Sequence, residues 1–213
     1  MRPLGILGGT FDPVHHGHLR TALEVADAFE TERVLLIPAG DPPHRAAPVA
    51  DGATRLALIG AAIGDEPRLG VDDRELRRTV PSYTVLTLGE LRRERGGQPL
   101  LLILGMDAFA GLAGWHRWTE IVGLAHIVVA HRPGWSPPDT GPVADLWRAH
   151  GTDDRAALSG APAGRVLLLA TTQLDIAASR LREMLSAGGD PRYLMPEAVR
   201  RMIRETGLYA RKR

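Results

Sequence analysis

The chain lacks cysteine and holds a single lysine, Lys212, so arginine supplies nearly all of its basic side chains. The absence of cysteine excludes disulfides, thiolate zinc sites, iron–sulfur clusters and cysteine nucleophiles. The near absence of lysine argues against a phosphate-loop lysine or a buried Schiff-base lysine. An excess of one charge sign is also lacking, because the formal net charge is only +1. Neither nucleic acid nor a membrane surface is therefore expected as a partner.

Long hydrophobic runs are missing as well. No apolar stretch reaches the length of a membrane-spanning helix, and Leu4–Leu7 is too short and too interrupted by glycine for a signal peptide. We therefore expect a soluble cytoplasmic protein. Its 213 residues, 44% of them hydrophobic, fit one domain over residues 1–213 with a helical C-terminal portion from about residue 176. No apolar seam fixes an oligomeric state, so a homo-oligomer is left open.

Short apolar runs bounded by glycine or proline alternate with helical patterns along the chain. Such runs are typical of strands that are covered on both faces. Their alternation with helices predicts an α/β fold, a doubly wound and mostly parallel sheet with helices on both faces. The predicted strands are Leu4–Leu7, Val34–Pro38, Leu100–Gly105, His126–Ala130 and Arg165–Ala170. The predicted helices cover 19–29, Thr54–Ile63, Tyr83–Arg93 and Ile176–Leu185.

Segments rich in glycine, proline or polar residues predict loops at Ala39–Val49, Arg132–Asp139 and Gly151–Gly164. The first of them carries three prolines and is a candidate for a flap that closes over a ligand. The last is polar and is expected to be exposed. The charged run from Asp73 to Arg78 is also expected at the surface, since charge runs are usually solvated.

The segment Gly8–His18 reads Gly-Gly-Thr-Phe-Asp-Pro-Val-His-His-Gly-His and joins the first predicted strand to the first predicted helix. In an open parallel sheet, ligands bind at this kind of position, outside the carboxyl end of a strand and at a helix N-terminus. Gly8 and Gly9 would let the backbone turn sharply and approach an anion. His15 and His18 would place two imidazoles on one side of the helix entrance. There they could donate hydrogen bonds to phosphate oxygens and stabilise charge that develops as a phosphoryl group is attacked.

Other interpretations of this segment stay open from the residues alone. Two histidines beside a turn are often surface residues, and His-x-x-His can bind a metal, although only Asp12 lies nearby as a third ligand. A dinucleotide-dependent oxidoreductase is disfavoured, because Gly5-x-x-Gly8-Gly9 lacks the Gly-x-Gly-x-x-Gly spacing and no acidic residue clearly ends the second predicted strand. The position between a strand and a helix favours anion binding.

The same segment resembles the signature of the nucleotidylyltransferases marked by His-x-Gly-His. Further segments, in family order and over nearly the whole chain, are similar to the bacterial nicotinate-mononucleotide adenylyltransferases. The opening motif is shared with pantetheine-phosphate and glycerol-phosphate relatives, so the combination is what indicates nicotinate mononucleotide. The further segments are Pro42–Arg45, Asp73–Leu76, Ser82–Thr84, Gly105–Asp107, Trp115, Arg132–Gly134, Tyr193–Pro196 and Gly207–Tyr209.

The resemblance implies a Rossmann-like nucleotidylyltransferase fold and transfer of the adenylyl group of ATP to nicotinate mononucleotide, without a covalent enzyme intermediate. ATP and nicotinate mononucleotide are then the small-molecule partners. Mg²⁺ is the implied cofactor, carried mainly by ATP, and no protein metal ligand is named. The resemblance assigns catalysis to His15 and His18. It assigns ATP binding to Gly8, Gly9, Thr10, Phe11, Gly17, His44, Arg45, Gly105, Asp107, Ser179 and Arg182, and mononucleotide binding to Tyr83, Thr84, Trp115 and Arg132.

Residues 176–182 depart from the family pattern. They read Ile-Ala-Ala-Ser-Arg-Leu-Arg where the family has Ile-Ser-Ser-Thr-x-Ile-Arg, so two hydroxyl donors are lost. Ser179 would cap the helix and Arg182 would grip the β and γ phosphates; a capped helix whose arginine faces water is the alternative. Asp107 would bind ribose hydroxyls, cap a helix, or do both. Trp115 would stack on the nicotinate ring or simply pack, with Trp118 competing for the interior.

Rival functions stay open beside this one. The same chemistry could act on nicotinamide mononucleotide, phosphopantetheine or a polyol phosphate, and a nucleotide-binding regulator could have lost catalysis. Thr84 at the start of a helix and Trp115 as a stacking plate favour nicotinate. The intact pair of His15 and His18 favours an active enzyme.

Overall fold

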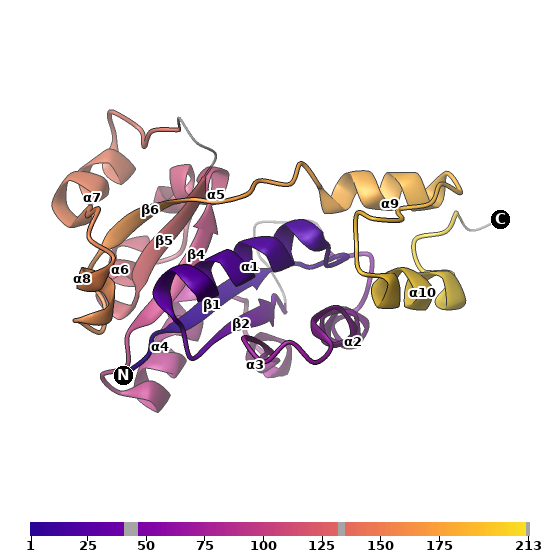
Figure 1. Cartoon of the computed structure of the whole chain (residues 1–213), viewed down its shortest axis with the longest axis horizontal. Coiled ribbons are helices and arrows are strands. Elements are labelled where there is room, and N and C mark those ends of the chain that lie inside the picture. Colours follow the sequence, from indigo (N-terminus) through magenta and orange to yellow (C-terminus); the bar gives the residue numbers. More distant parts are fainter. Residues whose placement is uncertain (41–46, 132–134, 212–213) are drawn as a thin grey trace.

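Six parallel strands form one sheet in the computed structural model, which describes residues 1–40, 47–131 and 135–211 (Figure 1). The strand order is β3-β2-β1-β4-β5-β6, so the chain changes direction across the sheet between β1 and β4. In such sheets the carboxyl ends of the strands at this switch point border the ligand site. The strands are β1 (Leu4–Gly9), β2 (Arg33–Pro38), β3 (Leu69–Val71), β4 (Leu100–Gly105), β5 (His126–His131) and β6 (Val166–Ala170).

Helices cover both faces of the sheet. One hydrophobic cluster joins the sheet to α1 (His16–Phe29), α2 (Gly52–Ile63), α8 (Ala156–Ser159), α9 (Ala178–Ser186) and α10 (Glu197–Thr206). A second cluster joins the opposite face to α4 (Thr84–Arg95), α5 (Met106–Ala110), α6 (Ile121–Leu124) and α7 (Pro142–His150). Three short elements complete the fold: α3 (Arg74–Arg77), η1 (Leu112–Gly114) and η2 (Trp118–Glu120).

The strands supply side chains to both clusters in turn. In β2, Val34 and Leu36 belong to the first cluster, and Leu35 and Ile37 belong to the second. Because successive side chains point to opposite faces, a strand that is covered on both sides needs an apolar residue at nearly every position. This explains the continuous apolar runs of the sequence, and the predicted doubly wound α/β class is confirmed.

The structure differs from the sequence-based expectation at several places. The helices α3, α5, α6 and α7 are not among the predicted helices. The three-residue strand β3 at the edge of the sheet is not among the predicted strands, because its Leu-Gly-Val sequence is too short to form a pattern. The expectation of a loop at Gly151–Gly164 is wrong for Ala156–Ser159, which form α8, whereas most of the segment is exposed or half-exposed as expected. Leu158 of α8 is fully buried in the first cluster and anchors an otherwise polar segment.

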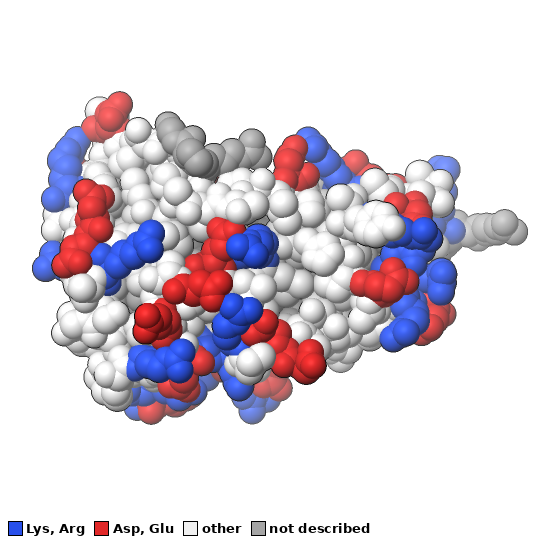
Figure 2. Space-filling model, in the orientation of Figure 1, with Lys and Arg blue, Asp and Glu red and all other residues white. Residues whose placement is uncertain are grey.

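The surface mixes charges of both signs. Figure 2 shows acidic and basic side chains interspersed on the visible face, in keeping with the formal net charge of +1. Within the described residues, no helix combines the length and the hydrophobicity that a bilayer crossing requires.

The helical C-terminal portion shares the core of the sheet. Met195, Val199 and Ile203 lie in the same hydrophobic cluster as the strands. The Tyr209 hydroxyl donates a hydrogen bond to Oδ1 of Asp12 at 2.6 Å, and burial together with this contact raises the pKa of the phenol well above its ordinary value. These contacts support the prediction that residues 1–213 form one domain.

Replacing Tyr209 by phenylalanine would remove this hydroxyl and keep the ring. We expect Tyr209→Phe to lower the free energy of unfolding by about 1–3 kcal/mol, because a buried carboxylate loses one of its donors. Urea unfolding followed by far-ultraviolet circular dichroism measures the change. All four tryptophans precede residue 176, so tryptophan fluorescence reports on unfolding of the part that contains the sheet. If the chain is a single domain, the fluorescence and the circular dichroism change at the same urea concentration.

Tyr193→Phe is the matched control, because the Tyr193 side chain is 85% exposed and should contribute no such stability. Equal stability of Tyr209→Phe and the unaltered protein would show that the buried hydrogen bond is not formed in solution. Two separate unfolding transitions would contradict the single-domain prediction.

Candidate active site

The glycines of the first motif provide space rather than a turn. Gly8 and Gly9 end β1, and neither has a positive φ; the left-handed residue is Phe11, with a φ of 50°. The predicted sharp turn at the two glycines is therefore wrong. A Cβ on Gly9 would lie 3.1 Å from the Phe11 ring, so a larger residue there would force this ring to shift. A Cβ on Gly8 would meet no protein atom within 4 Å, and both glycines line an open cavity.

The two histidines of the motif lie against each other at the start of α1. The rings of His15 and His18 stack with centroids 3.7 Å apart and planes 25° apart. The backbone N–H of His15 donates to Nδ1 of His18 at 3.3 Å. Because Nδ1 of His18 accepts this bond, the neutral ring carries its proton on Nε2. The structure thus places both imidazoles on one side of the helix entrance, as their spacing predicts.

Burial keeps this imidazole pair uncharged. It lowers the pKa of His15 to about 4, with a smaller contribution from the charge of His16. It also lowers the pKa of His18 well below the ordinary value, with a contribution from His15. At neutral pH the two rings are therefore hydrogen-bonding groups rather than cations.

Gly17 leaves room for the His15 ring. A Cβ at residue 17 would lie 3.0 Å from Nδ1 and 3.1 Å from Cε1 of His15, closer than ordinary contacts allow. Any larger residue between the two histidines would push this ring away from its stacked position.

Asp12 ties the motif to three distant segments. Its carboxylate is 3% exposed and accepts hydrogen bonds from the N–H groups of Val49 (2.8 Å) and Ala50 (3.1 Å) as well as from Tyr209. Arg182 Nη1 donates to the Asp12 carbonyl at 2.7 Å and lies 3.8 Å from Oδ2. Sequence reasoning considered Asp12 only as a third metal ligand and missed this anchoring role.

The helix that follows β6 corrects two expectations. Arg182 is directed to the motif loop by its contacts with Asp12, so the alternative of a water-facing arginine is wrong. Ser179 is not the helix cap, because α9 begins at Ala178 and the N-cap position is held by Ala177, which has no capping side chain. Ser179 lies one residue inside the first turn and is exposed.

A second arginine, Arg55, supports the same loop and was missed from the sequence. It is 2% exposed on α2, and its guanidinium donates to the carbonyls of Thr10 (2.8 Å) and Ala50 (3.1 Å). The sequence did contain a signal for this role: an arginine stands within the apolar helical pattern of Thr54–Ile63. The loop is thus held by arginines from both α2 and α9.

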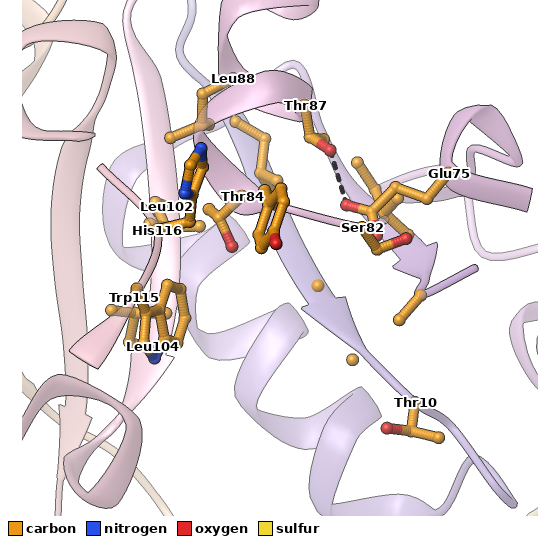
Figure 3. A pocket seen from close by; sticks show the side chains of 16 residues that line it. Thr10, Glu75, Ser82, Thr84, Thr87, Leu88, Leu102, Leu104, Trp115 and His116 are labelled. Carbon is orange, nitrogen blue, oxygen red and sulfur yellow. Dashed lines mark hydrogen bonds between the residues drawn. The ribbon is translucent and has the colours of Figure 1, made fainter. Parts of the chain in front are cut away.

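A cavity of about 190 Å³ opens beside the motif and is shown in Figure 3. It brings Gly8, Gly9 and Thr10 together with Tyr83, Thr84 and Trp115, which the resemblance assigned to two different substrates. Tyr83 precedes the first residue of α4 and stacks on His116 with centroids 4.2 Å apart. The other residues of the lining are Ile6, Ile37, Ala39, Glu75, Ser82, Thr87, Leu88, Leu102, Leu104 and His116.

An adjoining hollow lies at the carboxyl end of β4. Gly105 and Asp107 line it together with Trp115, which is therefore shared with the larger cavity. Gly105 holds the N-cap position of α5, so the alternative of Asp107 as the cap is wrong; its carboxylate lies in the first turn of α5. Trp118 lines a different hollow, beside α7.

Four lining residues with polar side chains, Glu75, Ser82, Thr87 and His116, were not assigned to the site from the sequence. The expectation of a charged surface at residues 73–78 is wrong for Glu75, which is 8% exposed, and for Arg74 and Arg78, whose side chains are 12% and 9% exposed. These side chains are largely buried because their hydrogen-bonding partners lie on α4. A pattern in residues 73–78 alone cannot predict these partners. Arg77 remains exposed as expected.

Three predicted site residues, His44, Arg45 and Arg132, lie outside the described residues. Their assignments to ATP and to the mononucleotide stay predictions from the resemblance.

Comparison with known proteins defines the class first. A family model described as cytidylyltransferase-like matches residues 6–184, which is most of the chain. Among solved structures, a Plasmodium falciparum nicotinic acid mononucleotide adenylyltransferase complexed with NaAD has the same fold, with a TM-score of 0.76, 14% identity and 98% of each chain covered.

Curated relatives narrow the class. A probable nicotinate-nucleotide adenylyltransferase of Hahella chejuensis is 49% identical over 209 residues, covering 97% of this chain and 95% of the relative. A relative of the same name from Aeromonas hydrophila is 46% identical over 207 residues, covering 97% of each chain. The chain belongs to the nicotinate-nucleotide adenylyltransferases of the cytidylyltransferase-like family.

The burial of His15 predicts how the protein responds to pH. We expect an NMR titration of its Cε1 proton to show a midpoint near pH 4. Between that value and the ordinary value of 6.5 the unfolded chain binds more protons than the folded one. The contribution to stability is therefore complete above pH 6.5 and declines as the pH falls toward 4. A midpoint near 6.5 would show that the ring is not buried in solution.

Proposed function

We propose that the chain transfers the adenylyl group of ATP to nicotinate mononucleotide by direct in-line attack, a step of NAD biosynthesis. An oxygen of the 5′-phosphate of the mononucleotide forms a bond to the α-phosphorus of ATP while the bond from that phosphorus to the β-phosphate oxygen breaks. The products are nicotinate adenine dinucleotide and pyrophosphate. The observation that carries this proposal is one cavity lined by the Gly8–Thr10 motif on one side and by Tyr83, Thr84 and Trp115 on the other.

The motif side of the cavity suits ATP. Little covalent chemistry falls to the protein in such a transfer, so positioning and charge stabilisation carry the rate. His18, with its proton on Nε2, donates to the negative charge that develops around the α-phosphorus, and His15 supports it. Arg182, beside Asp12, grips the β and γ phosphates.

The remaining proposed ATP contacts also lie on residues that the resemblance assigned to ATP. Gly8, Gly9, Thr10, Phe11 and Gly17 leave room for the nucleotide along β1 and α1, and the Asp107 carboxylate near Gly105 accepts from ribose hydroxyls. The flap residues His44 and Arg45 and the exposed Ser179 complete the phosphate contacts in this proposal.

The opposite side suits the mononucleotide. The Trp115 ring provides a plate for stacking with the nicotinate ring. The first amide groups of α4, next to Tyr83 and Thr84, receive the nicotinate carboxylate, since a helix N-terminus favours an anion. Arg132 is the second proposed partner of this carboxylate.

Mg²⁺ enters the proposal as part of the substrate, bound to the triphosphate and retaining much of its water. It would neutralise phosphate charge during the transfer. Across the three described ranges, no three His, Cys, Asp or Glu side chains are grouped so as to hold a metal ion. We name no protein ligand for it.

Removing the His18 imidazole tests the catalytic role. We expect His18→Ala to lower kcat by roughly a hundredfold or more, the scale of one preorganised donor to a transition state, with the fold unchanged. Pyrophosphate release at saturating substrates measures kcat. His16→Ala is a matched control, because its side chain lines a separate hollow with Tyr193 and Arg200 and should keep its activity. A loss confined to ATP affinity would contradict the catalytic role.

The choice of acceptor tests the substrate. With Mg²⁺ and ATP, we expect a higher kcat/KM for nicotinate mononucleotide than for nicotinamide mononucleotide, because the neutral amide lacks the charge that the start of α4 favours. A coupled assay of pyrophosphate, run with both mononucleotides side by side, measures the ratio.

The other outcomes separate the rival functions. A clear preference for the amide would overturn the proposed specificity, and turnover of phosphopantetheine alone would replace the acceptor. ATP binding without pyrophosphate release from any acceptor would indicate a regulator that has lost catalysis.

A further inference from the structure

The cavity contains a buried carboxylate to which the proposed mechanism gives no role. Glu75 on α3 is 8% exposed and lines the same space as Tyr83 and Trp115. Among the described lining residues it is the only acid, and none is lysine or arginine. An ionised carboxylate at such a place has lost most of its hydration and needs a compensating partner.

The described residues supply little compensation for this charge. The hydroxyl of Thr87 donates to Oε1 of Glu75 at 2.6 Å (Figure 3). Arg78 donates to the same hydroxyl oxygen at 3.2 and 3.3 Å, but its ion pair is with Glu90 at 2.8 Å. Within the described part of the chain, Glu75 takes part in no ion pair, and its Oε2 accepts no hydrogen bond. Among the described residues, one neutral donor, the Thr87 hydroxyl, therefore supports the negative charge of Glu75.

Close backbone packing fixes this carboxylate at the cavity wall. A Cβ on Gly40 would lie 2.2 Å from the carbonyl oxygen of Glu75, so only glycine allows this approach. The N–H of Gly40 also donates to Oγ of Ser82 at 2.9 Å, and Ser82 lines the cavity as well. The segment that carries Glu75 is thus held against the chain that leads into α4.

We propose that Glu75 is a specificity-determining residue that provides the counter-charge for the pyridinium ring of the mononucleotide. This inference rests on the proposed function, because the ring nitrogen of nicotinate mononucleotide is bonded to ribose and carries a fixed positive charge. A buried carboxylate without an ion pair is stabilised when a cation enters its cavity. The aromatic rings of Tyr83 and Trp115, which line the same cavity, favour a flat cation for an independent reason, the negative potential of their faces.

The substrate is zwitterionic in this arrangement. Its carboxylate goes to the amide groups at the start of α4, and its ring charge goes to Glu75. The cavity would therefore select the oxidised, cationic ring over a neutral ring of nearly the same shape and substituents.

Reduced nicotinate mononucleotide provides the test, because its dihydropyridine ring is uncharged. We expect the unaltered enzyme to have a higher kcat/KM for the oxidised than for the reduced mononucleotide. Glu75→Gln keeps an acceptor for Thr87 and should narrow this ratio by about tenfold or more, as expected when a charge pair in a partly desolvated cavity is lost. The change should fall on KM for the oxidised mononucleotide, with KM for ATP unchanged.

Glu94→Gln is the matched control. Its side chain is 53% exposed, pairs with Arg74 and is not part of the cavity lining, so its removal should leave the ratio unchanged.

A second measurement needs no variant and covers the case in which Glu75→Gln does not fold. N-methylnicotinate and 3-methylbenzoate share a carboxylate and a ring shape, but only the first ring is cationic. As competitors of the mononucleotide on the unaltered enzyme, we expect the first to have the lower inhibition constant by about tenfold.

The outcomes separate this inference from the proposed function. An unchanged ratio in Glu75→Gln, or equal inhibition by the two probes, would overturn the counter-charge while leaving the adenylyl transfer intact. Absence of turnover with both mononucleotides would overturn the proposed function itself.

Discussion

The buried carboxylate of Asp12 is the contact on which the site depends. It accepts N–H groups of Val49 and Ala50 and the hydroxyl of Tyr209, and it lies beside the guanidinium of Arg182. A buried charge is stable only when it is paired and hydrogen-bonded. The end of the flap, α9 and the turn that follows α10 must therefore all reach the loop after β1 before that charge can be buried. The histidine pair begins three residues later on the same loop and takes its position from this closure.

The preference for arginine over lysine has a structural meaning beyond the chemistries that it excludes. Arg92 donates to four backbone carbonyls, and Arg55 donates to two. A guanidinium presents five donors in one fixed plane and can serve four carbonyls at once, whereas an ammonium group has only three donors on a flexible stem. The carbonyls bound by Arg92 are those of Leu124, Gly96, Gln98 and Pro162. Arginine here joins loops that no regular hydrogen-bonding ladder connects.

The fold could be predicted because strands covered on both faces leave an unmistakable run of apolar residues, as in β2 and β5. The placement of the histidine pair could be predicted because residues three apart at the start of a helix lie on the same side of it. The burial of Glu75 and Arg78 could not, because both depend on Thr87 and Glu90, which approach only when α4 packs on the sheet. The same charged residues in isolation would be solvated. Gly17 was only partly predictable. The motif that contains it was visible in the sequence, but its close approach to the His15 ring was not.

The uncharged state of the two imidazoles fits the proposed reaction better than a pair of cations would. A fixed positive pair would bind the triphosphate of the ground state strongly, and binding that is equal in ground and transition states does not speed the chemical step. A neutral donor at a fixed place gains most where negative charge accumulates as bonds to phosphorus form and break. The stacking of His15 on His18 maintains this state, because each ring shields the other from water and a proton on one disfavours a proton on the other. The contact that positions the rings therefore also keeps them neutral.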